Sequence, residues 1–541
     1  MDNLLSWMIW MPFLAALIVG FIPSSQKLLI KIIALVATTL QLALGVVLFM
    51  SFDGGLVPKS WTEAFQFTEL LPWIQLRLGN IGSLNIDYHL GVDGISMPLV
   101  VMSLILLVIG VISSWKLDHK VKGYFLLYLI LSGSLIGCFA ALDFFLFYVF
   151  FEFMLLPMFF LIGIWGGPNR AYASIKFFIY TLLGSLLILI VMIGLYLSVG
   201  FVDEFGNQVN SFSLVQMLSG DYVVGTLLTP GETFTLWGLP LRTLAFLALL
   251  IGFLIKLPAI PFHTWLPDAH VEAPTAISVL LAGVLLKVGG YGLFRICYGI
   301  FPDVAMEMAY PVAVLGVISI VYGGMVAMAQ NDIKRLIAYS SVSHMGFVLL
   351  GLAAISVEGV SGSLFQMVSH GFISGALFLT VGVIYDRTHN RQIESVSGLA
   401  SKMPVFTFFV VLFYFASLGL PGLSGFVGEV LVLMGAIGAE AASGLFPRWV
   451  GMVAVFGIIV SAGYYLWTLQ RMFFGAYWVR EQSWEQFMND LSPREILMLV
   501  PLALLVLLLG VYPALLLGPI ENSINFFTEH LLSGGQSYLD R

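Results

Sequence analysis

The feature that most constrains this chain is a succession of long apolar runs between residues 4 and 518. A helix needs about 20 mostly apolar residues to cross a hydrocarbon layer of roughly 30 Å, and the runs are close to that length. Of the 541 residues, 60% are hydrophobic and only 10% are charged, which lies far outside the range of soluble domains. The sequence therefore predicts an integral membrane protein.

We expect an all-α fold with about fourteen transmembrane helices. The first run could be a secretory signal, but it lacks a basic start and a small-residue cleavage site, so we interpret it as the first span. Two runs are unusually long and contain Pro or Gly, which predicts broken helices at 241–271 and 404–438. The predicted spans are 4–22, 28–50, 94–115, 124–141, 144–164, 174–199, 241–271, 275–300, 308–328, 335–354, 361–385, 404–438, 448–473 and 496–518.

The distribution of Lys and Arg predicts the orientation, because positively charged loops stay on the cytoplasmic side. Loops after odd-numbered helices hold 15 of the 23 basic residues, and the opposite loops with the C-terminal tail hold six. The six are Lys59, Arg77, Arg242, Arg295, Arg448 and Arg541; Lys256 and Lys287 fall inside spans. This predicts that both termini and the two long loops, 51–93 and 200–240, face outward. Acidic residues in these loops are Asp53, Glu63, Glu69, Asp203, Glu204, Asp221 and Glu232.

The two broken helices also suggest an internal repeat. FLIKLPAIPF at 253–262 and ASLGLPGLSGF at 416–426 each place a Leu-Pro break before a Phe, five spans apart. An odd separation makes two tandem units enter the membrane from opposite sides, as in inverted-repeat transporters. The alternative is that Pro and Gly are simply common in membrane helices. We therefore expect a three-helix segment at 1–123, repeats at 124–300 and 301–475, and a C-terminal helix and short tail at 476–541.

The chain lacks the sequence patterns that hold cofactors. Cys138 and Cys297 lie inside apolar runs and cannot supply a four-cysteine iron-sulfur site, so we interpret them as packed thiols. No glycine-rich dinucleotide motif and no phosphate-binding loop is present in the sequence. Any metal, nucleotide or redox centre of a larger assembly would therefore lie in other chains.

Six ionisable residues fall inside predicted spans. A charged side chain at a helix centre costs about 2.5 to 3.5 kcal/mol on insertion scales, so such residues are functional candidates by default. Each has a structural alternative: a lysine can extend to the interface, a histidine can be a packing residue, and a carboxylic acid can bond a neighbouring helix. Because opposite charges recur in separate helices, we favour function for the set, which comprises Glu152, Lys256, Lys287, His344, His370 and Glu429.

The residue types suit proton transfer better than binding of a large solute. An ordinary lysine holds its proton too tightly to relay it, but burial disfavours the charged form and a nearby carboxylate restores it. A change in the distance between Glu152 and Lys256 would then make the amine gain or release a proton. Histidine, which titrates near neutral pH, is a natural intermediate carrier.

The helix breaks offer further polar groups. Pro258 and Pro261 have no N–H, so the carbonyls of Leu254 and Leu257 lose their usual helical partners and could accept from an ammonium or water. At the second break, free N–H groups at the start of the new half-helix favour an anion nearby, and Glu429 follows it. The alternative is a kink that serves packing alone.

Three segments resemble a known family. KLPAIPFHTWLPDAHVEAPTAISVLLAGVLLKVGGYGLFR at 256–295, QNDIKRLIAYSSVSHMGFV at 330–348 and LPGLSGFVGEV at 420–430 are similar to the antiporter-like membrane subunits of respiratory complex I, the proton-translocating NADH:quinone oxidoreductase. The resemblance covers most of the chain. It is strongest to the M type, the counterpart of mitochondrial subunit 4, because L-type and N-type relatives resemble one another in having lysine where this chain has Glu429. A second feature that distinguishes the L type is that it continues into a long lateral helix after its last span.

The resemblance implies a role for each of the six residues. It implies Glu152 and Lys256 as a coupled ion pair, Lys287 as the next relay, His344 and His370 as central carriers, and Glu429 as the terminal site. It also implies fourteen helices with two inverted five-helix repeats. NADH, FMN, iron-sulfur clusters and quinone would be held by other subunits, with L-type and N-type subunits as neighbours in a bacterial inner membrane and no nucleic acid partner.

Other functions remain open at this level. A subunit of a multi-subunit cation/proton antiporter, or of a membrane-bound hydrogenase, would share the fold and many of these residues. A passive scaffold would leave the buried charges without a purpose. The resemblance also gives no account of the length of loop 51–93.

Overall fold

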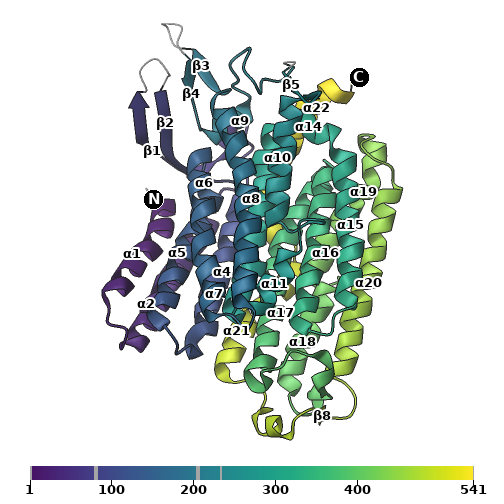
Figure 1. Cartoon of the computed structure of the whole chain (residues 1–541). Coiled ribbons are helices and arrows are strands. Elements are labelled where there is room, and N and C mark those ends of the chain that lie inside the picture. Colours follow the sequence, from purple (N-terminus) through teal and green to yellow (C-terminus); the bar gives the residue numbers. More distant parts are fainter. Residues whose placement is uncertain (1–2, 78–82, 203–207, 232–233, 540–541) are drawn as a thin grey trace.

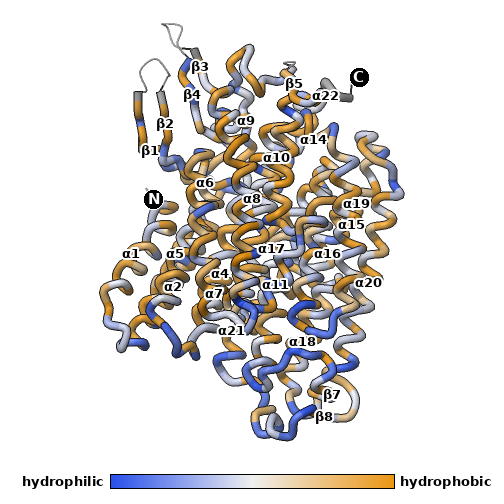
Figure 2. The backbone as a smooth tube through the Cα atoms, viewed as in Figure 1, coloured by the Kyte–Doolittle hydropathy of each residue, from blue (hydrophilic) through white to orange (hydrophobic). Residues whose placement is uncertain are grey.

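The computed structural model describes residues 3–77, 83–202, 208–231 and 234–539, and it is a bundle of long helices (Figure 1). Asp203, Glu204, Glu232 and Arg541, which entered the orientation argument, lie outside the described residues. Hydrophobic residues run along the helices, and hydrophilic residues gather at the end that carries β7 (Val396–Ser397) and β8 (Trp478–Val479) (Figure 2). This distribution is that of a multi-pass membrane protein.

The described part of the chain contains 13 helices long and apolar enough to cross a membrane. Twelve of them match a predicted span within a few residues, and the thirteenth, α19 (Ser424–Ala442), is the second half of the predicted span 404–438. Their segments are α1 (Leu4–Phe21), α2 (Lys27–Ser51), α4 (Ser96–Ser113) with η2 (Ser114–Lys116), α5 (Val121–Ala140), α6 (Phe144–Phe153) with α7 (Leu155–Trp165), α8 (Arg170–Tyr196), α12 (Thr275–Leu280) through η3 (Leu281–Leu285), α13 (Leu286–Gly292) and η4 (Leu293–Tyr298), α15 (Ala309–Met328), α16 (Ile333–Ala353), α17 (Val357–Thr388), α19 (Ser424–Ala442), α20 (Trp449–Met472) and α21 (Pro493–Val511).

Both predicted breaks are present. The first separates α10 (Leu241–Lys256) from α11 (Trp265–Glu272), and this pair is the remaining predicted crossing. The second separates α18 (Pro404–Ser417) from α19. Gly419 and Gly422 in the second break have φ of 79° and 90°, which residues with a Cβ rarely adopt. Proline at the first break and glycine at the second therefore end the helices where the sequence predicts.

Loop 51–93 has a structural role that the sequence did not reveal. It contains α3 (Trp61–Ala64) and an antiparallel hairpin of β1 (Gln66–Arg77) and β2 (Ser83–Val92). The Glu69 carboxylate accepts hydrogen bonds from the backbone N–H groups of Leu5, at 2.8 Å, and Ser6. Since the first N–H groups of a helix have no partner within it, the hairpin caps α1.

Other connections also contain short strands and helices, so the all-α prediction holds for the membrane part and not for every loop. The paired strands are β3 (Gly200–Val202) with β4 (Gln208–Asn210), β5 (Thr235–Leu236) with β6 (Leu239–Pro240), and β7 with β8. The short helices are α9 (Leu214–Ser219), α14 (Pro302–Glu307), η5 (Ile393–Ser395), η6 (Leu399–Ser401) and η7 (Gln482–Phe487).

The short tail predicted after the last span is itself helical. α22 (Ala514–Leu539) packs against α14 and α17. In this helix, Nε2 of His530 lies 2.7 Å from the carbonyl oxygen of Gly299. The imidazole ring of His530 stands edge-on to the Trp61 ring. Figure 1 shows α22 at the end of the bundle that carries the β1–β2 hairpin, so the C-terminal helix covers the predicted outer ends of the spans.

The helices pack closely where small residues face one another. A Cβ on Gly316 of α15 would lie 2.9 Å from the Gly346 carbonyl of α16, and a Cβ on Gly346 would lie 2.7 Å from the Gly316 carbonyl. Without a hydrophobic force between helices in lipid, the van der Waals packing that such close backbone approach allows contributes to their association.

One buried ion pair corrects an assignment made from the sequence. Arg295, counted above with the outward loops, is fully buried in η4 and pairs with Asp93 at 2.5 Å. The second Asp93 oxygen accepts from the backbone N–H groups of Ile95 and Ser96 at the start of α4. The pair therefore joins the ends of two helices, and its position near a span end made it look like a loop charge.

We predict that Asp93→Leu destabilises the protein by about 3 to 5 kcal/mol, because it leaves a buried guanidinium without a counter-charge. The measurement is the midpoint of thermal unfolding in detergent. Glu440→Leu is the control, since Glu440 pairs with Arg448 at an exposed site and its loss should cost less than about 1 kcal/mol. Equal shifts in the two variants would contradict the prediction.

Candidate functional site

The structure buries five of the six ionisable residues singled out in the sequence. Lys256, Lys287, His344, His370 and Glu429 expose 1%, 0%, 3%, 4% and 2% of their surface. Glu152 is half-buried. None of the five therefore extends to a headgroup region, which removes the interfacial alternative for them.

Lys287 and His370 are directly bonded. The Lys287 Nζ lies 2.7 Å from His370 Nδ1 and donates to the Ala282 carbonyl at 2.7 Å. Ala282 lies in η3, a π-helical turn whose hydrogen bonds skip one residue more than those of an α-helix. The distorted turn of the same helix thus supplies a carbonyl for the amine, and α17 supplies the imidazole.

The series continues from His370 to Glu429. The rings of His370 and His344 lie 5.5 Å apart between centroids. His344 Nδ1 is 3.3 Å from the Glu429 carboxylate, and its Nε2 is 3.1 Å from Ser417 Oγ. A small cavity of about 10 Å³ adjoins these side chains, which is close to the lower limit for one water molecule.

The second helix break shapes the Glu429 end of the series. The Glu429 side chain points back over the break, as helical side chains point toward the N-terminus. A Cβ on Gly419 would lie 2.5 Å from Glu429 Oε2. Gly419 therefore provides both the turn and the space that the carboxylate occupies.

Lys256 and Glu152 form a separate site at the first break. The Lys256 Nζ lies over the rings of Phe151 and Phe177, at 4.8 Å and 5.9 Å from their centroids. It interacts electrostatically with Glu152 but makes no hydrogen bond to another described residue. Glu152 also interacts with Tyr148, one turn earlier on α6. The two charges are near each other without a direct bond.

At the first break, the Leu254 carbonyl loses its usual helical partner, as expected, but another backbone N–H replaces it. The Leu254 carbonyl accepts from the Ala259 N–H at 3.1 Å, so it is not left for the Lys256 amine. The Trp265 indole N–H donates to the Ile255 carbonyl at 2.8 Å. The break is held by its own chain, because a residue beyond Pro258 replaces the missing N–H.

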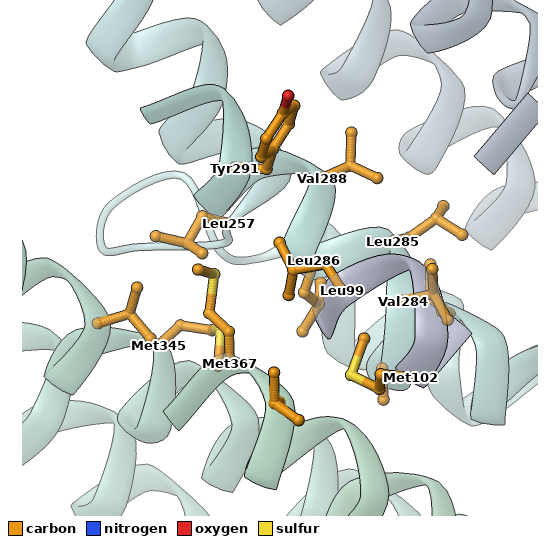
Figure 3. Close-up of a cluster of buried hydrophobic side chains, with 14 of the residues drawn as sticks. Leu99, Met102, Leu257, Val284, Leu285, Leu286, Val288, Tyr291, Met345 and Met367 are labelled. Carbon is orange, nitrogen blue, oxygen red and sulfur yellow. The ribbon is translucent and has the colours of Figure 1, made fainter. Parts of the chain in front are cut away.

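Apolar side chains adjoin both buried lysines in the chain. Leu257, Leu286, Met345 and Met367 belong to one buried cluster, in which Leu257 faces the two methionines (Figure 3). Leu257 follows Lys256 in the chain and Leu286 precedes Lys287. The structure therefore brings four predicted residues into one polar series, and among the described residues it gives the Lys256 amine no hydrogen bond to that series.

His270 is a buried ionisable residue that the sequence reasoning missed. Its ring is fully buried in α11 and stacks on Phe378 at 4.4 Å. It interacts electrostatically with Lys287 and with Lys334. The predicted span ended at 271, which placed this histidine near an interface; its place in the conspicuous HTWLPDAH segment was the available signal.

A cavity with charged residues in its lining lies at the end of α11, the helix that carries His270. It measures about 140 Å³ and is lined by residues that include Glu272, Lys334 and Arg391. The Lys334 amine donates to the Ala273 carbonyl at 2.6 Å, directly after α11. Lys334 and Arg391 belong to the predicted inner loops, so this cavity lies toward the predicted inner end.

The start of α6, the helix that carries Glu152, is held by another buried carboxylate. Asp143 accepts from the backbone N–H of Leu146 at 3.0 Å and of Asp87 at 3.2 Å. Burial raises the pKa of Asp143 to about 6, although these N–H groups oppose the shift. Asp143 thereby fixes the start of α6 to the β1–β2 hairpin.

Comparison with known proteins gives a consistent result. Residues 141–457 match the family described as NADH:quinone oxidoreductase/Mrp antiporter, TM. The chain is 43% identical to NADH-quinone oxidoreductase subunit M of Rhodobacter capsulatus over 527 residues, covering 96% of both chains. It is 37% identical to NADH-ubiquinone oxidoreductase chain 4 of Chondrus crispus over 523 residues, covering 96% of both.

Solved structures share the fold. A chain of respiratory complex I from Thermus thermophilus with bound NADH superposes with a TM-score of 0.79 at 28% identity, covering 97% of this chain and 99% of that one. A chain of the Mrp complex from Dietzia sp. DQ12-45-1b gives 0.78 at 19% identity over 99% and 98%. The second likeness concerns the fold alone.

We predict that Gly289→Ala destabilises the protein by about 1 to 3 kcal/mol, because the new methyl group would force two backbones apart. A Cβ on Gly289 would lie 2.7 Å from the Leu257 N and 3.0 Å from the Lys256 carbonyl carbon. Thermal unfolding in detergent measures the effect. Gly438→Ala is the control, because Gly438 lies in a helix and a Cβ there would meet no neighbouring heavy atom within 4 Å. This change should be neutral or stabilising. An equal loss of stability in Gly438→Ala would refute the steric explanation.

Proposed function

This chain belongs to the NADH:quinone oxidoreductase/Mrp antiporter family of membrane proteins and is a membrane subunit of the complex I type, and from that premise we propose that it moves protons through its buried Glu, Lys and His side chains. The series Lys287–His370–His344–Glu429 carries the proposal. These four groups contact one another within the membrane part of the bundle. Because each can hold or release a proton, they form a path that no bulky solute could follow.

The Glu152–Lys256 pair is the proposed control element. A carboxylate close to a buried amine favours the protonated amine, and moving the carboxylate away favours release. Leu257 and Met367 pack against Gly290 of α13, and in this proposal they form an apolar layer between the pair and Lys287. Transfer across it then requires a conformational or hydration change, which lets redox chemistry in other subunits set the timing.

His270 suits the inner entry to this path. It interacts electrostatically with Lys334, which lines the cavity at the end of α11, and with Lys287, at the start of the buried series. Its stacked ring has a fixed position, which favours repeated transfer between the same neighbours. We therefore add His270 to the six residues predicted from the sequence.

The wider assignment rests on the family. We propose L-type and N-type subunits as neighbours in a bacterial inner membrane, with NADH, FMN, iron-sulfur clusters and quinone held elsewhere in the complex. Both termini and the β1–β2 hairpin face outward in this proposal, in agreement with the basic inner loops. We also propose that residues 124–300 and 301–475 form two inverted repeats, each with one broken helix. Purification of the intact complex and identification of its subunits tests the partners.

We predict that Lys256→Ala and Glu152→Ala each reduce quinone-coupled proton pumping by more than half while the complex still assembles. Each variant removes one member of the pair and so uncouples the other from its opposite charge. Acidification driven by NADH in inverted membrane vesicles, with subunit content determined in parallel, measures both quantities. Wild-type pumping in assembled complexes carrying either change would reject the control role.

We predict that Glu429→Gln also lowers pumping, because it removes the titrating proton with little change in shape. The same vesicle assay applies. Glu440→Gln is the matched control, since Glu440 lies on the same helix at an exposed site paired with Arg448. Loss in the first variant and none in the second is expected; unchanged pumping in Glu429→Gln would remove this residue from the path.

A further inference from the structure

A chain of hydroxyl groups begins at Nε2 of His344, the ring nitrogen other than the one that faces Glu429. Ser417 Oγ lies 3.1 Å from His344 Nε2 and donates to the Tyr465 hydroxyl at 2.6 Å. Tyr465 donates to Ser340 Oγ at 3.0 Å. Ser340 donates to the Ile337 carbonyl at 2.8 Å. The three hydroxyl residues come from α18, α20 and α16, and all are buried.

The end of this chain sets its direction. A carbonyl oxygen only accepts, so the Ser340 hydroxyl must donate to Ile337 to make that bond. Its oxygen then accepts from Tyr465, and the Tyr465 oxygen accepts from Ser417. With its own proton already donated, Ser417 can only accept from His344. The reversed direction would give up the bond from Ser340 to the Ile337 carbonyl.

The other side of the imidazole has the opposite arrangement. His344 Nδ1 lies 3.3 Å from Glu429 Oε1 and 3.3 Å from the side-chain amide nitrogen of Gln366. A carboxylate and a ring nitrogen this close need one proton between them to bond. The amide of Gln366 is a donor that suits an unprotonated Nδ1 when that proton is absent. Nδ1 is thus the nitrogen that faces the next proton site.

We propose that Ser340, Tyr465 and Ser417 act as positioning residues that hold His344 with its fixed proton on Nε2, so that it exchanges the moving proton with Glu429 at Nδ1. This inference rests on the proposed proton path. In the transfer, the Nδ1–H bond of imidazolium breaks and an O–H bond forms on Glu429, and a neutral Nε2–H imidazole remains. With the fixed proton on Nδ1 instead, the lone pair would face Ser417, and the ring would have to turn before each transfer.

The hydroxyl chain does not serve as a second proton path in this proposal. Its last member is a backbone carbonyl, which has no proton to pass on and does not accept one at physiological pH. Its effect on transfer is therefore indirect, through the tautomer of His344. The second histidine is held differently, since Lys287 Nζ occupies Nδ1 of His370.

The test is Tyr465→Phe in the complete complex, because this change removes one hydroxyl and retains the ring. We expect infrared difference spectra of enzyme with isotope-labelled histidine to show a gain of the Nδ1–H ring signal at His344. That signal is assigned as the histidine band lost in His344→Gln. Pumping should fall by more than half with normal assembly. Ser340→Ala, which removes the terminal donor, should shift the same signal and serves if the first variant assembles poorly.

Tyr414→Phe is the matched control. Its ring lies 4.9 Å from that of Tyr465, and its buried hydroxyl makes no hydrogen bond to another described residue. A wild-type tautomer signal in Tyr465→Phe and Ser340→Ala overturns the inference, as does an equal pumping loss in Tyr414→Phe. If Glu429→Gln pumps normally, the proposed path itself fails; if Glu429→Gln loses pumping but Tyr465→Phe keeps the wild-type signal and rate, only the inference fails.

Discussion

The contact between Lys287 and His370 is the interaction on which the arrangement of the interior depends. In this low-dielectric interior, a π-helical carbonyl and an imidazole stabilise the Lys287 amine by hydrogen bonding. The imidazole in turn places the second histidine and the Glu429 carboxylate. Each member is satisfied by a residue on another helix, so the polar series also fixes how α13, α16, α17 and α19 pack.

Irregular backbone is used where polar side chains need partners or space. The first break is closed by its own Ala259 N–H and by the Trp265 indole, which leaves Lys256 among aromatic rings. The second break uses glycine, and the absence of a Cβ at Gly419 makes room for Glu429. Most of the first break is buried or half-buried, whereas Leu420, Pro421 and Gly422 of the second are exposed on the surface of this chain. The two breaks therefore support chemistry as well as packing.

The sequence-based expectations fared differently according to the kind of interaction each depended on. Spans and breaks were correct within a few residues, because hydropathy, proline and glycine act locally. Arg295 was assigned to a loop and His270 was overlooked, since both lie near a span end and only their partners, Asp93 and Phe378, reveal their burial. The hairpin at 66–92 was unexplained because its purpose, capping α1 through Glu69, joins segments distant in the sequence.

By itself, the sequence determined that the chain crosses the membrane many times and that six ionisable residues lie within those crossings, because the cost of burying charge or exposing apolar surface can be read residue by residue. Only the tertiary structure decided which of those residues meet. It joined Lys287, His370, His344 and Glu429, left the Lys256 amine without a hydrogen bond to that series, and placed a chain of hydroxyl groups at His344. Contacts between side chains depend on how helices rotate and pack against one another, and no local pattern encodes that rotation.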